Sequence, residues 1–241
     1  SKSKSLSLLR EARTSLSAQF SSELSESYVT AYDTMVKLQH LNHLEEVIIY
    51  KSASDEGKTT LQQLWKRRMR QMSRSVQHWT TSLAISSLVL TPEEDVESRL
   101  LYASLCRGAT WTGMAERTLQ KLLKVDDLTT NVALGDNVMP QVAMAYVKQV
   151  WYNISQSSAV QQLEAYVTRD PRQQHADAEA WCRTYLLLSE WLVLHNKSAS
   201  ALEHVKHATQ VDPTSVAAWH AWGMLNFRRV SELKSQRRPA M

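Results

Sequence analysis

Apolar residues recur at helical spacing along almost the whole chain. Near its C-terminal end, Trp219, Trp222 and Leu225 follow one another at intervals of three residues, which predicts a helix with two indoles on one face. Indole rings bury large apolar areas in folded proteins, so we expect both tryptophans to be buried against neighbouring helices. The Asp-Pro-Thr segment at 212–214 precedes this helix and is typical of one helix ending and the next beginning.

The same periodicity predicts helices along the rest of the chain. We expect them over residues 6–20, 28–38, 41–50, 61–83, 96–105, 114–123, 140–151, 160–167, 175–195 and 201–208. The pattern at 61–83 is unbroken and basic, and it predicts the longest helix of the chain. Residues 51–60 are polar and contain Gly57, and residues 126–137 lack periodicity, so both stretches are expected to be loops.

Composition favours the same architecture. The chain has 241 residues, of which only 5 are glycine and 5 are proline, whereas sheets and tight turns need both. We therefore predict an all-α fold, an irregular α-solenoid of antiparallel helical hairpins of the TPR or HEAT kind, with a period of ~34 residues in the later half. We expect residues 1–241 to form one helical-repeat segment, with the first helical layers and the long basic helix at 1–90 and TPR-like hairpins at 91–241.

Charge and cysteine content exclude few functions. No apolar run approaches the ~20 residues of a membrane span. Cys106 and Cys182 are far apart and are expected to be small core residues of a protein in a reducing compartment. The net charge of +4 permits an anionic ligand but does not demand nucleic acid. The start lacks an initiator methionine, which suggests a piece of a longer protein.

The candidate catalytic and metal-binding motifs each lack a required part. The Gly-Lys-Thr segment at 57–59 resembles the end of a P-loop, but Ser52 replaces the required glycine and the preceding segment is helical rather than a strand. Two histidine pairs have the one-turn spacing of metal ligands, without a third ligand to complete a site: His40 with His43, and His204 with His207. No metalloprotease, serine-hydrolase or kinase signature occurs. We predict no catalytic residue and no metal site.

The basic run from Lys66 to Arg70, with Arg74, allows two interpretations. It could bind an acidic partner, a phosphate-rich ligand or calmodulin. Alternatively, it is the solvated face of a helix whose other side packs inward, and we favour this second interpretation. The inward residues would be Trp65, Met72, Val76 and Trp79.

Four tryptophans in the later half also allow two interpretations. Trp181, Trp191, Trp219 and Trp222 could line a groove for a peptide. Packing between stacked helices is the interpretation we favour, because solenoid interiors need large side chains to fill the space between layers.

Distinctive short motifs occur in a fixed order over nearly the whole chain. The C-terminal motif is Ala-Trp-His-Ala-Trp at 218–222 with Asn-Phe at 226–227. Two other distinctive motifs are Leu-Glu-Glu-Val-Ile at 44–48 and Tyr-Ala-Ser-Leu-Cys at 102–106. Further motifs fall in the same order at residues 26–28, 31–32, 35–36, 50–51, 65, 79, 87–89, 92, 94–95, 140–142, 145–146, 148 and 190–191. Together these motifs resemble the FAT domain of target-of-rapamycin (TOR) kinases.

The resemblance implies a non-catalytic scaffold segment within a larger serine/threonine protein kinase, an ATP-dependent phosphotransferase. In that family the domain is a helical solenoid that braces the kinase domain and contributes to complex assembly in growth and nutrient signalling. The implied partners are the kinase domain of the same parent chain and TOR-complex subunits, with no nucleic acid and no membrane span. The implied location is the cytoplasm, with the complex at an endomembrane, lysosomal or vacuolar surface.

The resemblance also implies a site for inositol hexakisphosphate, which the family binds through basic side chains on several helices. Lys51 occupies one of those positions and is our candidate contact. Two other basic positions of the family hold Glu11 and Glu97 here, and a third holds Leu101. Carboxylates repel a polyphosphate, so these replacements argue against the ligand, and no other cofactor is expected.

Two alternatives remain open. One is a free-standing TPR-like adaptor that binds peptides in its concave groove. The other is an inositol-polyphosphate-binding helical module centred on Lys51 and the basic helix.

Overall fold

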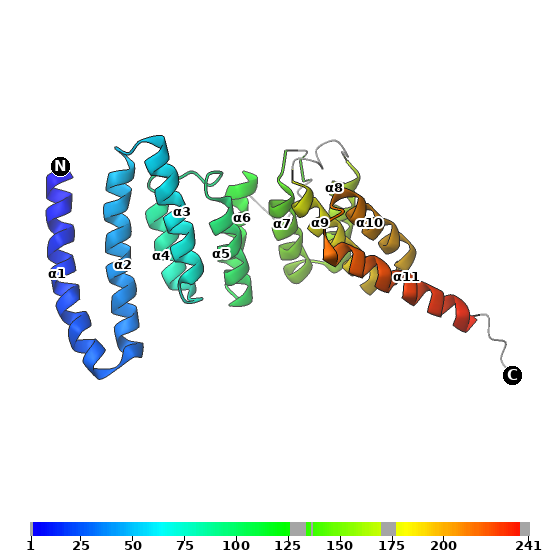
Figure 1. Cartoon of the computed structure of the whole chain (residues 1–241), viewed down its shortest axis with the longest axis horizontal. Helices are drawn as coiled ribbons and strands as arrows, with labels where there is room; N and C mark the ends of the chain where they lie inside the picture. The colour runs from blue at the N-terminus through cyan, green and yellow to red at the C-terminus, as the bar shows by residue number, and fades with distance from the viewer. Residues whose placement is uncertain (1, 126–133, 136, 170–176, 237–241) are drawn as a thin grey trace. The chain divides into compact units, whose positions relative to one another are not determined.

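The computed structural model describes residues 2–125, 134–135, 137–169 and 177–236 (Figure 1). Over these residues the chain is all-α, as predicted, and forms eleven helices. They are α1 (Lys2–Glu26), α2 (Tyr28–Tyr50), α3 (Asp55–Gln71), α4 (Val76–Ser86), α5 (Val96–Gly108), α6 (Thr112–Leu123), α7 (Pro140–Asn153), α8 (Gln156–Thr168), α9 (Ala178–Leu194), α10 (Ser198–Val211) and α11 (Val216–Gln236). The predicted loop at 126–137 lies mostly outside the described residues.

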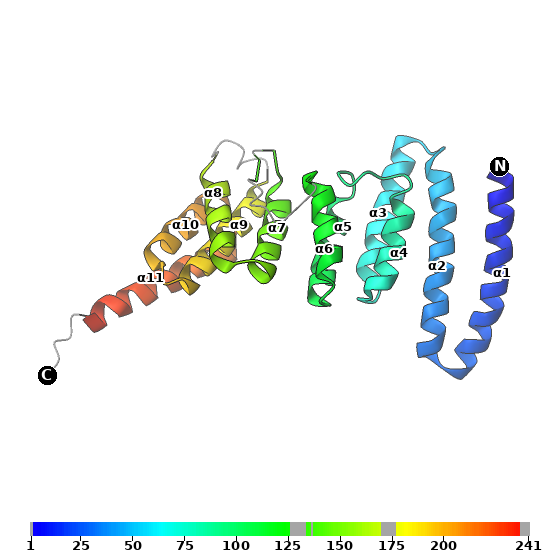
Figure 2. The ribbon, with the colours of Figure 1, turned by 180° about the vertical axis from the view of Figure 1, so that it is seen from behind.

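The chain divides into two compact units, Ser1–Thr118 and Leu119–Met241. In the first unit, α2 packs on α1, α3 and α4, and α4 packs on α5. Figures 1 and 2 show α1 and α2 side by side and running in opposite directions, as expected of a helical hairpin. In the second unit, α9 packs on α7, α8, α10 and α11, which makes it the central helix of that unit. The predicted boundary near residue 90 remains a prediction.

The prediction of two helices over 28–50 was wrong, because α2 runs without interruption from Tyr28 to Tyr50. The stretch Leu-Gln-His-Leu at 38–41 contains no glycine or proline, so nothing in it interrupts the backbone hydrogen bonds. The predicted loop at 51–60 is also shorter than expected. The Ser54 hydroxyl accepts a bond from the Gly57 amide at 3.3 Å and caps α3, which begins at Asp55.

The predicted long helix over 61–83 was wrong as well, because α3 ends at Gln71 and α4 begins at Val76. Two side chains engage the backbone of Ser73 in the gap. The Ser73 amide donates to the Tyr32 hydroxyl at 2.9 Å, and the Trp79 indole donates to the Ser73 carbonyl at 3.0 Å. Backbone groups that would have continued the helix are thus satisfied by side chains, and the helix breaks without a proline or a glycine.

The predicted burial of Trp219 and Trp222 was wrong, since these residues are 50% and 38% exposed. The packed side of α11 is instead the one that carries Ala218, which is fully buried against the rest of the unit. The Trp219 indole turns back to donate a hydrogen bond to the Pro213 carbonyl at 2.9 Å, and its ring meets Trp222 edge-on. Small residues let helices approach closely, so the alanine side of α11 makes the helix contact and the indoles lie outside it.

No helix of the described chain is long and apolar enough to cross a bilayer. The two cysteines are buried and free, as expected of core residues, and burial raises the pKa of both thiols.

Candidate functional site

A single carboxylate on α2 anchors the basic segment of α3. Arg68 donates to Glu46 twice, at 2.9 Å to Oε2 and 2.8 Å to Oε1, and the indole Nε1–H of Trp65 donates to Oε2 at 2.8 Å. Burial by itself raises the pKa of Glu46, but these donors outweigh it and hold the pKa of the carboxyl below its ordinary value. Three hydrogen bonds to one ionised group fix the orientation of α3 on α2.

The indole of Trp65 is also the centre of an apolar cluster beneath this anchor. Its ring lies 4.8 Å from the ring of His43 and 5.4 Å from that of Tyr50, measured between centroids. His43 is 3% exposed, and this burial lowers its pKa to about 4. The residues predicted to pack inward are all buried, which confirms that interpretation for one side of the basic segment: Trp65, Met72, Val76 and Trp79.

Cations of the basic run differ in whether they are paired. Lys66 and Arg70 both reach Glu97 on α5, the first at 3.9 Å. Arg67 and Arg74 are exposed, and neither has an ion pair within the described chain. Much of the positive charge that the sequence displays is therefore already engaged, and Arg67 and Arg74 remain available at the surface.

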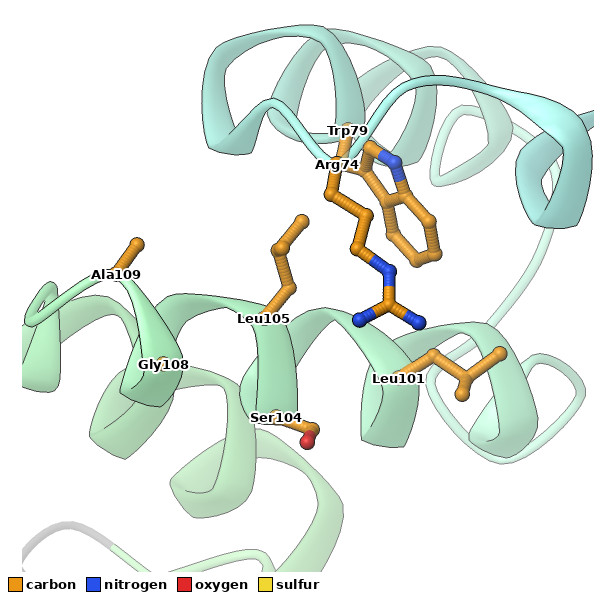
Figure 3. A pocket seen from close by; sticks show the side chains of 7 residues that line it. All are labelled: Arg74, Trp79, Leu101, Ser104, Leu105, Gly108 and Ala109. Atoms are coloured by element: carbon orange, nitrogen blue, oxygen red, sulfur yellow. The ribbon is translucent and has the colours of Figure 1, made fainter.

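A hollow of about 430 Å³ opens between the start of α4 and the exposed side of α5 (Figure 3). Its lining residues are Arg74, Trp79, Leu101, Ser104, Leu105, Gly108 and Ala109. Trp79 is 6% exposed and held by its bond to Ser73, so its ring is a fixed part of the wall. Figure 3 shows Arg74 extending along the indole with its guanidinium turned toward α5. The hollow thus places an unpaired cation beside an apolar wall.

Lys51, the candidate contact for inositol hexakisphosphate, follows the last residue of α2 and is exposed. Glu11 is exposed on α1, and Glu97 on α5 pairs with Lys66 and Arg70. Among the described residues, the ion pairs of Glu97 are with the basic run and not with Lys51. Binding of the polyphosphate at Lys51 remains a prediction.

The histidine pairs have structural partners. His40 is hydrogen-bonded to Ser82 at 3.0 Å, and His204 and His207 both stack on the ring of Tyr185. Within the described residues, no group of three or more histidine, cysteine, aspartate or glutamate side chains could hold a metal ion.

The segment that resembles a P-loop forms the first turn of α3. There Lys58 pairs with Asp55 at 3.4 Å. A P-loop requires a strand and a glycine-rich loop before its helix, whereas this segment lies within a helix and follows another helix.

Two of the four tryptophans discussed above are core residues of the second unit. Trp191 stacks on Trp151 with centroids 4.3 Å apart, and Trp181 stacks on Tyr166 at 5.2 Å. Trp181 and Trp191 are each 6% exposed. Packing is therefore the correct interpretation for these two, whereas Trp219 and Trp222 are surface residues.

The sequence did not reveal three of these contacts: Glu46 with Arg68, Glu97 with Lys66 and Arg70, and Leu105 with the hollow. One signal was available for Glu46, since it lies within the otherwise apolar Leu-Glu-Glu-Val-Ile segment, where a carboxylate requires a partner. The partner itself lies 22 residues away and could not be named from spacing.

Comparison with known proteins assigns the fold to a family. The FAT domain family model matches residues 3–240. The chain is 34% identical to serine/threonine-protein kinase mTor of Drosophila melanogaster over 244 residues, which cover 95% of this chain and 10% of that protein. It is 29% identical to serine/threonine-protein kinase TOR of Arabidopsis thaliana over 250 residues, covering 90% of this chain and 10% of the relative.

A third relative, serine/threonine-protein kinase TOR2 of Saccharomyces cerevisiae, is 28% identical over 256 residues, which cover 93% of this chain and 10% of that protein. The chain thus spans about a tenth of the length of these relatives. The family match extends over nearly every residue and agrees with the all-α fold. This chain belongs to the FAT domain family.

Proposed function

We propose that this segment is a non-catalytic scaffold of a TOR-type serine/threonine protein kinase, in which it braces the kinase domain and supports complex assembly in growth and nutrient signalling. The observation that carries the proposal is the alignment of almost the whole chain with about a tenth of each of three serine/threonine-protein kinases. No kinase signature occurs in the chain itself, so the phosphotransfer chemistry is assigned to another part of the parent protein.

Rigidity is the property that a brace requires, and the internal contacts of each unit supply it. In the first unit, the Glu46 carboxylate ties α3 to α2 through Arg68 and Trp65. In the second, the stacked pair Trp151–Trp191 joins α7 to α9. Close-packed interiors have low compressibility and transmit force between elements, which is how a helical array holds an attached domain in position.

The proposed partners follow from this role. They are the kinase domain of the same parent chain and the other subunits of a TOR complex, rather than nucleic acid or the interior of a membrane. We propose that the parent protein is cytoplasmic and that its complex lies at an endomembrane, lysosomal or vacuolar surface.

Two leucines near the end of α9 provide a matched test. Leu192 is fully buried, whereas Leu194 is 66% exposed. In the parent protein, Leu192→Asp buries an unpaired carboxylate and should unfold the second unit, while Leu194→Asp adds the same charge at the surface. The measurements are kinase activity toward a protein substrate and co-purification of the other complex subunits.

The proposal expects Leu192→Asp to abolish activity and assembly and Leu194→Asp to leave both unchanged. A parent protein that carries Leu192→Asp and remains fully active and assembled would contradict the bracing role. So would a parent reading frame without a glycine-rich loop, a catalytic aspartate and a magnesium-binding aspartate.

A further inference from the structure

We propose that the hollow between α4 and α5 binds a short acidic segment of a partner protein, which inserts a bulky apolar side chain and places a carboxylate on Arg74. The proposal concerns the surface of the first unit and does not depend on the bracing role. A chain that failed as a brace would still be expected to bind this partner.

The shape and lining of the hollow select an apolar side chain. Leu101 is 42% exposed, and it lines the hollow together with Leu105 and the indole of Trp79. Concave sites of a few hundred Å³ with apolar walls are the usual receptors for inserted side chains, and about 430 Å³ lies within that range. An apolar ligand group binds more strongly in a concavity lined by apolar residues than on a convex surface. The reason is that the walls of a concavity remove both sides of the inserted group from water.

The charge beside the hollow selects an acidic segment. The guanidinium of Arg74 is turned toward α5 and has no hydrogen bond or ion pair within the described chain. Its planar fork is suited to a bidentate contact with a carboxylate. Close by in sequence, Lys66 and Arg70 share the single carboxylate of Glu97, so this pair of cations retains an excess positive charge. An approaching acidic peptide is attracted by the whole run and oriented by Arg74.

The same features disfavour a polyphosphate or nucleic acid as the occupant. Such ligands need several converging cations, whereas Arg74 is the one charged side chain among the described residues that line the hollow. The rest of the lining is two leucines, a tryptophan, a serine, a glycine and an alanine. An apolar wall beside one guanidinium matches a leucine-like side chain next to a carboxylate better than it matches a row of phosphates.

Fluorescence anisotropy with designed peptides tests the proposal on the 241-residue chain. The probe is a fluorescein-labelled nonapeptide in which glutamate-glutamate-leucine is repeated. One control peptide replaces the leucines by serine and keeps the charge, and another replaces the glutamates by glutamine and keeps the leucines. The proposal expects both controls to bind about tenfold more weakly than the probe. Equal binding of the serine peptide would overturn it, as would no binding of the probe up to about 1 mM.

Matched variants of the chain locate the contact. Arg74→Glu reverses the charge beside the hollow, and Ser104→Trp fills the hollow from α5. Each substitution should lower the affinity for the probe peptide by about tenfold or more. Arg67→Glu makes the same charge reversal on α3, at a residue that does not line the hollow. It should lower the affinity for the probe peptide by less than about threefold. All three positions are exposed, so unchanged unfolding temperatures are expected. Wild-type affinity in Arg74→Glu, or equal losses in Arg74→Glu and Arg67→Glu, would overturn the proposal.

Discussion

Arg68 reaches from α3 to α2 and binds both carboxylate oxygens of Glu46, at 2.9 and 2.8 Å, with each side chain only 18% exposed. A charge pair that is largely removed from water adds little net stability, but the loss of one partner leaves the other without compensation. The most constrained cation of the basic run therefore has a structural role, and the run is not a uniform surface for anions.

Removing Arg68 should destabilise the first unit. In Arg68→Ala, Glu46 keeps only the hydrogen bond from Trp65 among those within the described chain, so we expect the free energy of unfolding to fall by roughly 2 kcal/mol. Urea denaturation followed by circular dichroism measures this change. The control is Arg67→Ala, at an exposed neighbouring position, which should alter the free energy by less than about 0.5 kcal/mol. Equal effects of the two substitutions would contradict the anchoring role of Glu46.

His43 should make the first unit sensitive to mild acid. Burial lowers its pKa to about 4 in the folded chain, against the ordinary value of 6.5. Between these values the unfolded chain binds a proton that the folded chain does not, so the stability present above about pH 6.5 is lost as the pH falls toward 4. The loss is at most about 3 kcal/mol over that window.

The variant His43→Phe tests this prediction, because it keeps a ring against Trp65 and removes the titrating group. Its urea midpoint should change less between pH 7 and pH 5 than that of the parent chain. Burial also lowers the pKa values of His40 and His204, so part of the pH dependence should remain. Glu46 does not interfere, since its lowered pKa matters only below its ordinary value of 4.5. Identical pH dependence in the two chains would refute the assignment.

Two tryptophans of the second unit should respond very differently to truncation. Trp191 is 6% exposed and stacks on Trp151. Trp191→Ala therefore opens a cavity and should lower the free energy of unfolding by about 3–5 kcal/mol. Trp222 is 38% exposed on α11, and Trp222→Ala should cost less than about 1 kcal/mol in the isolated chain. Thermal unfolding of the two variants compares them directly. Equal losses would show that α11 is packed through its indoles after all.

The helices themselves could be predicted because their signals are local. Pro140 at the start of α7 and the Asp-Pro segment before α11 are read from neighbouring residues alone. The break between α3 and α4 could not be predicted, because it depends on Tyr32, which is 41 residues from its partner Ser73. Periodicity continues through the break and conceals it.

For the candidate site, the inward side could be predicted and the surface could not. The spacing of Trp65 and Trp79 correctly placed both indoles in the interior. Spacing does not reveal which cations find carboxylates on other helices, so Arg68 and Arg74 looked equivalent although one is paired and the other is not. The same limit explains why the predicted burial of Trp222 was wrong. A periodic pattern shows that residues share a face of a helix, but it does not show what covers that face.

Lys51 gives the last prediction. The other positions that the resemblance connects with inositol hexakisphosphate hold Glu11, which is exposed, Leu101, and Glu97, which is already bound to Arg70. A single exposed lysine beside such replacements should bind a polyphosphate weakly. We therefore expect inositol hexakisphosphate at about 100 µM to raise the unfolding temperature of the chain by less than about 1 °C. Differential scanning fluorimetry measures the shift, with Lys51→Ala as the matched variant. A shift of several degrees in the parent chain that Lys51→Ala abolishes would instead establish Lys51 as a ligand contact and show that the carboxylates do not prevent binding.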